Sequence, residues 1–190
     1  MKLAWGLTGC GDKLMETIQV MKGLKDLYGD ILLVEVFLSK AAQLVARYYK
    51  AIEPLETGFD RFWVEVDSNT PFLPGRLQLG EFDILLIAPA TSNTVAKIAV
   101  GIADTLITNS AIQAIKGYTP VYIMPVDYRE GETTTTLPNG RSLRLRVRKE
   151  DADNVRKLEA MEGVHTFEWP GDIPGIVERL MNQPQPSREG

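Results

Sequence analysis

Short apolar runs alternate with segments of helical periodicity along most of this chain. The apolar runs predict strands at 3–8, 31–38, 62–66, 84–88, 120–124 and 164–167. In other segments apolar residues recur every three or four positions, which predicts helices at 14–28, 40–50, 95–100, 152–161 and 173–181. Strands that alternate with helices build a mostly parallel sheet covered on both faces. The pattern therefore predicts an α/β protein with a three-layer, Rossmann-like (flavodoxin-like) fold.

Two segments have a less definite pattern. In the helix at 40–50 we expect Leu44 and Val45 to point inward. Between residues 51 and 80 the only predicted element is the strand at 62–66, and prolines and glycines indicate loops. The large apolar residues there have three open interpretations: core, which we favour, a lid over a pocket, or a subunit contact. They are Phe59, Phe62, Trp63, Phe72 and Leu73.

The segment after the strand at 120–124 contains a run of threonines and the sequence LPNG at 137–140, which together predict turns. Residues 141–149 then alternate strictly, as in a half-buried strand or a hairpin arm, with Leu143, Leu145 and Val147 on one face. The other face carries Arg144, Arg146 and Arg148. We favour a solvated or interface surface for this basic face; an anion site for an acidic substrate or redox partner is the alternative.

Length and composition narrow the function classes. The 190 residues predict a single domain at 1–181, followed by a polar, proline-rich tail at 182–190 that we expect to be disordered. A net charge of −4 argues against a nucleic-acid binder, and no apolar run approaches the roughly 20 residues of a membrane span. The amino terminus lacks a signal-type apolar core, and the single cysteine fits a reducing cytoplasm. One Cys and one His are too few for a usual metal site.

Small polar residues follow the apolar strand at 84–88. In open α/β sheets, ligands bind at the carboxyl ends of strands, where backbone N–H groups and short side chains approach them closely. A second polar cluster begins at Thr108 and Asn109, and the two clusters resemble two walls of one pocket. The first cluster consists of Pro89, Ala90, Thr91, Ser92, Asn93 and Thr94.

The first strand runs directly into Gly9, Cys10 and Gly11, which precede the helix at 14–28. This turn has two open interpretations: a cradle for a phosphate at a helix start, or a tight turn without a ligand. Ser39, at the end of the second strand, is placed to cap the next helix or to offer its hydroxyl to a phosphate, and the two roles are compatible.

Few side chains in this sequence offer acid–base or nucleophilic chemistry. The lone His165 lies in a late strand, and we interpret it as a structural residue. No Ser/His/Asp set is recognisable. A helix start can lower the pKa of Cys10, but without a nearby His we favour a small residue standing where Ser or Thr would also fit. A pocket with so few reactive groups indicates that a bound cofactor carries the chemistry.

Several segments of the chain resemble those of a known family. PATSNT at 89–94, followed by AKIAVGIADTLIT, resembles the PASANT motif and following helix of the homo-oligomeric flavin-containing cysteine decarboxylase superfamily. MPVD, TTTT-LPNG and RLRVRKEDADNVRKLEAMEGV are similar to archaeoflavoprotein and the flavin-dependent dihydromethanopterin reductases. The resemblance implies FMN, with its phosphate at Gly9–Gly11 and Ser39, its ring at Pro89–Thr94, and Thr108 and Asn109 closing the pocket.

Two departures from the superfamily indicate the reaction class. The decarboxylases carry a catalytic histidine after the second strand, where this chain reads LSKAAQLVARYY. Their PxMNxxMW-type motif is also absent, since the matching strand ends MPVDYREG. We therefore expect an FMN-dependent oxidoreductase that transfers a hydride to dihydromethanopterin, a step of one-carbon metabolism.

Alternatives and partners follow from the same resemblance. One alternative is an electron-transfer flavoprotein that receives electrons from ferredoxin or another carrier. A flavin-dependent decarboxylase or flavin transferase is a third possibility. The resemblance also implies a homo-oligomer built on trimers, or a larger closed assembly, with the flavin near a subunit boundary.

Overall fold

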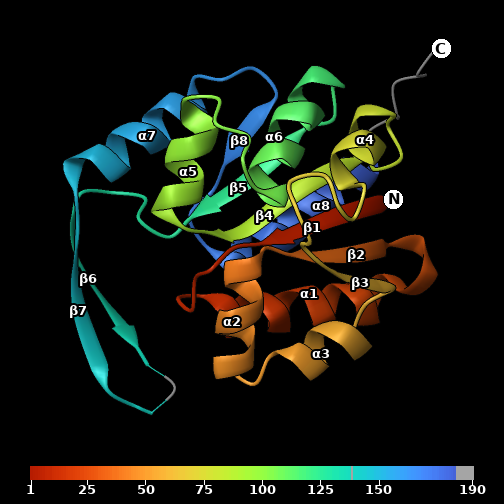
Figure 1. The fold of residues 1–190 in the computed structure, drawn as a ribbon. Helices are drawn as coiled ribbons and strands as arrows, with labels where there is room; N and C mark the ends of the chain where they lie inside the picture. Colours follow the sequence, from red (N-terminus) through yellow and green to blue (C-terminus); the bar gives the residue numbers. More distant parts are fainter. Residues whose placement is uncertain (138, 183–190) are drawn as a thin grey trace.

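A six-stranded parallel sheet forms the centre of the protein. The structure, a computed structural model, describes residues 1–137 and 139–182. The strand order is β3-β2-β1-β4-β5-β8, and every pairing is parallel (Figure 1). The strands are β1 Lys2–Leu7, β2 Leu33–Leu38, β3 Arg61–Val64, β4 Ile84–Ala90, β5 Val121–Pro125 and β8 Val164–Thr166. The strand order reverses between β1 and β4, which is where open α/β sheets bind their ligands.

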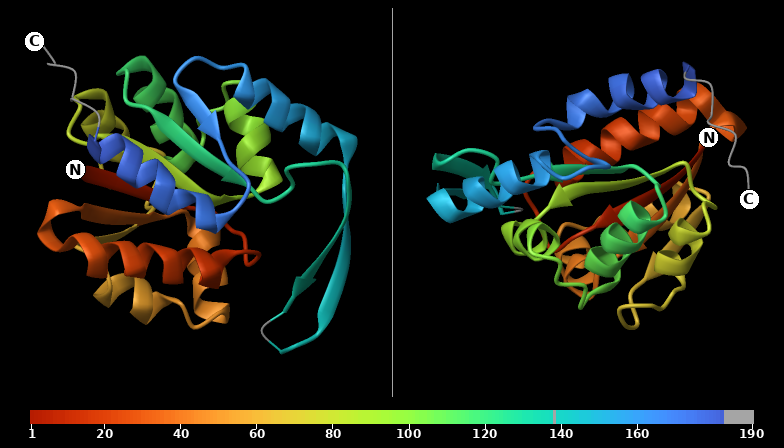
Figure 2. Two further views of the ribbon diagram at one scale, coloured as in Figure 1. Left: turned by 180° about the vertical axis from the view of Figure 1, so that it is seen from behind. Right: turned by 90° about the horizontal axis from the view of Figure 1, so that it is seen from above.

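Helices cover both faces of the sheet (Figure 2). One face packs against α1 Leu14–Tyr28, α2 Lys40–Tyr48, α3 Ile52–Thr57 and α8 Ile173–Asn182. The other packs against α4 Leu73–Gln78, α5 Ser92–Ala99, α6 Leu106–Lys116 and α7 Lys149–Glu159. Two short 3₁₀ helices, Gly29–Ile31 and Pro170–Asp172, precede β2 and α8. The predicted three-layer, flavodoxin-like fold is confirmed.

Alternation along each strand divides the core into two layers. In β1, Leu3 and Trp5 belong to the layer under α1 and α8, and Ala4 belongs to the layer under α6. All seven residues of β4 are buried, as expected for a central strand of a parallel sheet. Burial on both faces explains why these strands read as continuous apolar runs in the sequence.

Several predicted helix details were wrong. In α2 the buried residues are Ala42 and Ala46, whose small side chains let this helix lie close to the sheet. Val45 is half-buried against the core, as predicted, whereas Leu44 is 67% exposed. The helix α5 begins at Ser92, three residues before the predicted start, since Thr91 caps it. Helices α3 and α4 lie between residues 51 and 80, where we predicted no helix.

The five apolar residues between 59 and 73 do not share one environment. Phe59 and Leu73 are buried, as the core interpretation predicted, and Phe62 and Trp63 are half-buried. Phe72 is 64% exposed, so the core interpretation is wrong for this residue.

The strands β6 Gly131–Thr136 and β7 Ser142–Val147 form an antiparallel hairpin, here called the arm. The arm extends from the body alongside the edge where the parallel strands end (Figure 1). The threonine run is therefore a strand and not a turn, since β7 supplies its hydrogen-bonding partner. The hairpin prediction is correct, but the face predicted to be half-buried is largely open: Leu143 and Leu145 are 39% and 46% exposed, and only Val147 is buried.

Two further expectations concern the tail at 182–190 and a possible membrane span. Asn182, predicted to begin the disordered tail, is the last residue of α8, and residues 183–190 lie outside the described part of the chain. None of the helices that the structure describes has the length and apolar character needed to cross a membrane.

A buried ion pair fastens α4 to the sheet. The Glu35 carboxylate in β2 is 3% exposed and accepts two hydrogen bonds from Arg76, at 2.7 and 2.9 Å, and one from Trp63 at 3.0 Å. Burial alone would raise the pKa of Glu35, but these hydrogen bonds and the charges of Arg76 and Lys2 outweigh burial and lower the pKa to about 2. Glu35 is thus a structural carboxylate.

We predict that Glu35→Gln lowers the free energy of unfolding by about 3 kcal/mol at pH 7, because Arg76 loses its buried partner. A lowered folded-state pKa means that this stability is complete above the ordinary value of 4.5 and is lost as pH falls toward 2. Denaturant titrations of both proteins from pH 7 to pH 2 should therefore converge in that window. Glu81→Gln is the control: Glu81 also binds Arg76, at 2.9 Å, but it is 44% exposed and should contribute less than about 1 kcal/mol. Equal losses for the two variants would contradict the prediction.

Candidate functional site

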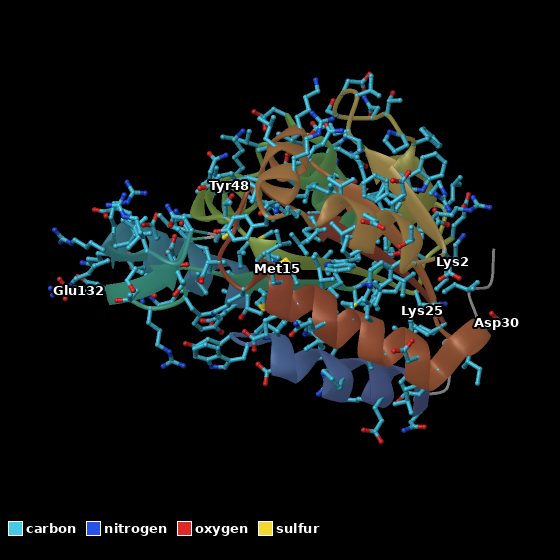
Figure 3. The ribbon with its side chains drawn as sticks, turned by 90° about the horizontal axis from the view of Figure 1, so that it is seen from below. Lys2, Met15, Lys25, Asp30, Tyr48 and Glu132 are labelled. Atoms are coloured by element: carbon cyan, nitrogen blue, oxygen red, sulfur yellow. The ribbon has the colours of Figure 1, made fainter. Side chains whose placement is uncertain are left out.

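Four neighbouring strands end at one edge of the sheet, here called the carboxyl edge. In sheet order they are β2, β1, β4 and β5, and they lead into Ser39, Thr8, Thr91 and Val126 respectively. The arm lies on this side of the molecule (Figure 1). In Figure 3, Glu132 of the arm, Tyr48 and Met15 lie toward this edge, whereas Lys2 and Asp30 lie at the opposite end of the strands.

The Thr8 hydroxyl ties the end of β1 to the end of β4. Its Oγ1 donates to the carbonyl oxygen of Pro89 at 2.8 Å and accepts from the backbone N–H of Thr91 at 2.9 Å. Earlier in β1, the indole N–H of Trp5 donates a hydrogen bond to the carbonyl oxygen of Ala88 at 2.7 Å. The predicted cluster at 89–94 is therefore held directly beside the turn after β1.

Gly9 and Gly11 allow that turn to pack tightly against α2. A Cβ on Gly9 would lie 2.7 Å from Cβ of Ala41, and a Cβ on Gly11 would lie 2.3 Å from the hydroxyl oxygen of Tyr49. Ser39 joins the same contact, since its backbone N–H donates to the Leu7 carbonyl oxygen at 3.0 Å. The structure thus brings together the two segments predicted to bind a phosphate.

This junction presents hydrogen-bond donors. The Ser39 hydroxyl caps α2 by accepting from the N–H of Ala42 at 3.0 Å. Within the described part of the chain, the backbone N–H groups of Gly9, Gly11 and Ala41 have no hydrogen-bond acceptor. Free N–H groups at the positive end of a helix are the features that bind a phosphate, so the junction fits that role.

The first turn of α5 has a similar character. Thr91 caps the helix, and its hydroxyl lies 3.1 Å from the hydroxyl of Thr94. Ser92 donates a hydrogen bond to the carboxylate of Asp127, which follows β5. Asn93 is exposed. This turn therefore combines N–H donors with hydroxyl and amide groups next to the β1 turn.

Thr108 and Asn109 lie in the first turn of α6 and not in a separate polar turn. The Thr108 hydroxyl lies 2.8 Å from that of Thr105 in a capping box and is almost fully buried. The Asn109 amide donates to the carbonyl oxygen of Ser68 at 2.9 Å and to the side chain of Asn69 at 3.0 Å. Both side chains thus have protein partners, and their part in closing a pocket stays a prediction.

Glu65, which the sequence reasoning did not single out, links α6 to the site. Its carboxylate accepts from the N–H of Lys40 at 2.9 Å and from the N–H of Leu106 at 3.0 Å. These are the first residues of α2 and α6, so one carboxylate satisfies two helix starts. An acidic residue within the strand predicted at 62–66 was the available signal, but its two partners are 25 and 41 residues away in the chain.

Comparisons with known proteins identify the family. The family model described as Flavoprotein matches residues 1–137. The chain belongs to the flavoprotein family. It is 50% identical over 177 residues to an uncharacterized protein of Methanocaldococcus jannaschii, covering 93% of this chain and 94% of that protein. It is also 32% identical to a dihydromethanopterin reductase (acceptor) of the same organism, covering 91% and 94%.

A solved structure agrees with this assignment. DmrB of Burkholderia xenovorans in complex with FMN, described as a cubic protein cage for redox transfer, is 34% identical to this chain. The TM-score is 0.80, and the match covers 95% of each chain. The predicted resemblance to flavoproteins of the dihydromethanopterin reductase group is confirmed.

Burial, together with two nearby carboxylates, keeps the cysteine of this flavoprotein protonated. Burial is the main cause that raises the pKa of Cys10, to about 12, and the negative charges of Asp12 and Asp127 act in the same direction. The thiol donates a weak hydrogen bond to the carbonyl oxygen of Asp12, 3.6 Å away, which together with the charge of Lys13 only partly opposes the rise. Cys10 is thus a neutral thiol at physiological pH, as the interpretation of a small residue implied, and not an activated nucleophile.

His165 lies away from the carboxyl-edge cluster. It belongs to β8, the outer strand of the sheet, and its ring stacks on Tyr122 with 4.7 Å between centroids. The side chain is exposed and borders an open pocket of about 570 Å³ on the α8 side. The structure thus places the imidazole away from the Gly9 turn and α5, and its structural role stays a prediction.

Proposed function

We propose that this flavoprotein binds FMN at the carboxyl edge and reduces a pterin of the dihydromethanopterin type. The observation that carries the proposal is similarity along almost the whole chain to a protein named dihydromethanopterin reductase, together with a donor-rich junction at the strand-order reversal. When bound, FMN supplies hydride transfer, a reaction for which protein side chains have no equivalent.

The chain's own residues divide the binding of FMN between two segments. We assign the phosphate to the N–H groups of Gly9, Gly11 and Ala41 and to the Ser39 hydroxyl. We assign the polar edge of the ring to residues 89–94, where α5 begins. Cys10 adds a small, uncharged wall to the site.

The protein's part in the reaction is positioning and the exclusion of water. The described carboxyl edge holds no histidine, and its cysteine is protonated. The segment after β2, where the decarboxylases carry their catalytic histidine, reads LSKAAQLVARYY. Placement of a substrate against a cofactor needs no such residue, so this composition favours a reductase over a decarboxylase.

An electron-transfer flavoprotein that accepts electrons from ferredoxin or another carrier is the second candidate. Its partner would need a charged docking surface, and the basic face of β7 was the predicted one. Within the described residues, however, Arg144 pairs with Glu132 and Arg148 pairs with Asp151, which leaves Arg146 without an ion pair. The partly neutralised face favours the pterin reductase.

We also propose a homo-oligomer built on trimers. Apolar side chains stay exposed on the side of the carboxyl edge and on the arm, and contact with another copy of the chain would bury them. They include Met15, Leu44, Tyr48, Leu143 and Leu145. Light scattering measures the assembly directly, and a monomeric mass at micromolar concentration would rule the oligomer out.

The reaction itself is tested anaerobically. We expect the purified protein to be yellow with extractable FMN, and the photoreduced protein to be reoxidised when dihydromethanopterin is added. Flavin absorbance follows the reoxidation, and product analysis should find tetrahydromethanopterin. Reduction of the flavin by reduced ferredoxin, with no reoxidation when the pterin is added, would support the electron-transfer candidate instead.

The phosphate assignment is tested by Ser39→Asp. Aspartate caps a helix as well as serine, so the apoprotein should keep its melting temperature, but its charge repels a phosphate at the same helix start. We expect FMN affinity, measured by flavin fluorescence quenching, to fall by about 100-fold, which is an order-of-magnitude figure for a close pair of like charges. Ser39→Asn, an uncharged cap, is the matched control and should lose much less. Equal FMN affinity in the two variants would show that the phosphate binds elsewhere.

A further inference from the structure

Asp127 places a carboxylate at the carboxyl edge, and it is not among the residues that we assign to FMN binding. It follows β5, and the N–H of the preceding Val126 donates to the carbonyl oxygen of Ala90 at 3.1 Å. The carboxylate accepts a hydrogen bond from the Ser92 hydroxyl in the first turn of α5. Backbone and side chain are thus both fastened to the end of β4 and the start of α5, and the residue is only half-buried.

The surroundings leave this carboxylate available to a ligand. Its charge acts on Cys10, so the carboxylate lies near the turn after β1. The charge of Asp127 also contributes to the raised pKa of Arg148. The guanidinium of Arg148, however, binds Asp151 through hydrogen bonds of 2.6 and 2.9 Å. Within the described part of the chain, Asp127 forms no ion pair, and its hydrogen-bond partner is Ser92.

The N–H groups at the carboxyl edge donate hydrogen bonds, whereas the carboxylate of Asp127 accepts them. Gly9, Gly11 and Ala41 present N–H donors suited to an anion. Asp127 is an acceptor of hydrogen bonds, so the part of a ligand that meets it must present N–H or O–H groups. Asp12, the other carboxylate beside Cys10, accepts a hydrogen bond from Thr135 of the arm at 3.2 Å.

A pterin has an edge that matches a carboxylate. Its 2-amino group and the adjacent ring N3–H are parallel donors, which two carboxylate oxygens can accept together, and such charge-assisted pairs are strong and orientation-specific. One oxygen of Asp127 also accepts from Ser92, but each carboxylate oxygen has two lone pairs. A substrate that presented a carboxylate here would instead meet a like charge.

We propose that Asp127 selects the pterin by accepting hydrogen bonds from its 2-amino and N3–H edge, and that it disfavours carboxylate substrates at the same position. This inference rests on the proposed pterin reductase function and names the residue that orients the substrate. Asp127 is thus a specificity-determining residue that lies outside the two segments assigned to FMN.

The experiment uses a ligand pair that differs at one group. In 6-methyllumazine an oxygen replaces the 2-amino group of 6-methylpterin, so a donor becomes an acceptor. Equilibrium dialysis with the FMN-loaded protein gives the affinity for each. We expect the wild type to prefer 6-methylpterin by roughly 10- to 100-fold, in line with a hydrogen bond to a charged group. Asp127→Asn should reduce that preference to about 2-fold or less, since an amide can also donate to the lumazine oxygen.

Three controls make the outcomes decisive. Asp12→Asn removes the other carboxylate next to Cys10 and should keep the preference, which separates a specific contact from bulk charge. Asp127→Ser should lose the preference as Asp127→Asn does. The FMN affinity, measured by fluorescence quenching, should stay within about 2-fold of the wild type in every variant. A wild type that binds neither pteridine would overturn the proposed function, and this inference with it. A wild-type preference that survives in Asp127→Asn would overturn the inference alone.

Discussion

The hydroxyl of Thr8 is the interaction on which the site depends. It bonds to the carbonyl of Pro89 and to the N–H of Thr91, and so it fixes the two central strands at the point where the strand order reverses. Parallel strands diverge beyond their ends, and a side chain that bridges them holds the following turns together. Without this bridge the turn after β1 and the start of α5 would share an edge of the sheet without sharing a site.

Close packing completes what the Thr8 bridge begins. Gly9 lies against Ala41 and Gly11 lies against the ring of Tyr49, so any larger residue would separate the β1 turn from α2. The glycines are therefore required by the contact with the helix. The contacts show a tight turn, and its role as a phosphate cradle stays a proposal.

Charge is arranged unevenly around the carboxyl edge. Free N–H groups lie at the ends of β1 and β2, whereas Asp127 follows β5 and accepts a hydrogen bond at the start of α5. On the side toward β3, the carboxylate of Glu65 accepts hydrogen bonds from the first N–H groups of α2 and α6. An anion and a group rich in N–H donors would thus be drawn to different parts of one site. This separation suits a phosphorylated cofactor that must leave room for a second, differently charged ligand.

The sequence by itself determined the fold class, because strands buried on both faces must be apolar throughout and helices at a surface must be periodic. It also placed the polar clusters at strand ends, since Gly9, Ser39 and Thr91 follow their strands directly in the chain. Tertiary structure alone decided which groups meet: Thr8 with Pro89, Gly11 with Tyr49, and Glu65 with the start of α6. It also decided that α2 buries Ala42 and exposes Leu44, and that the threonine run pairs as a strand. These contacts join residues far apart in the sequence, and local periodicity carries no information about distant partners.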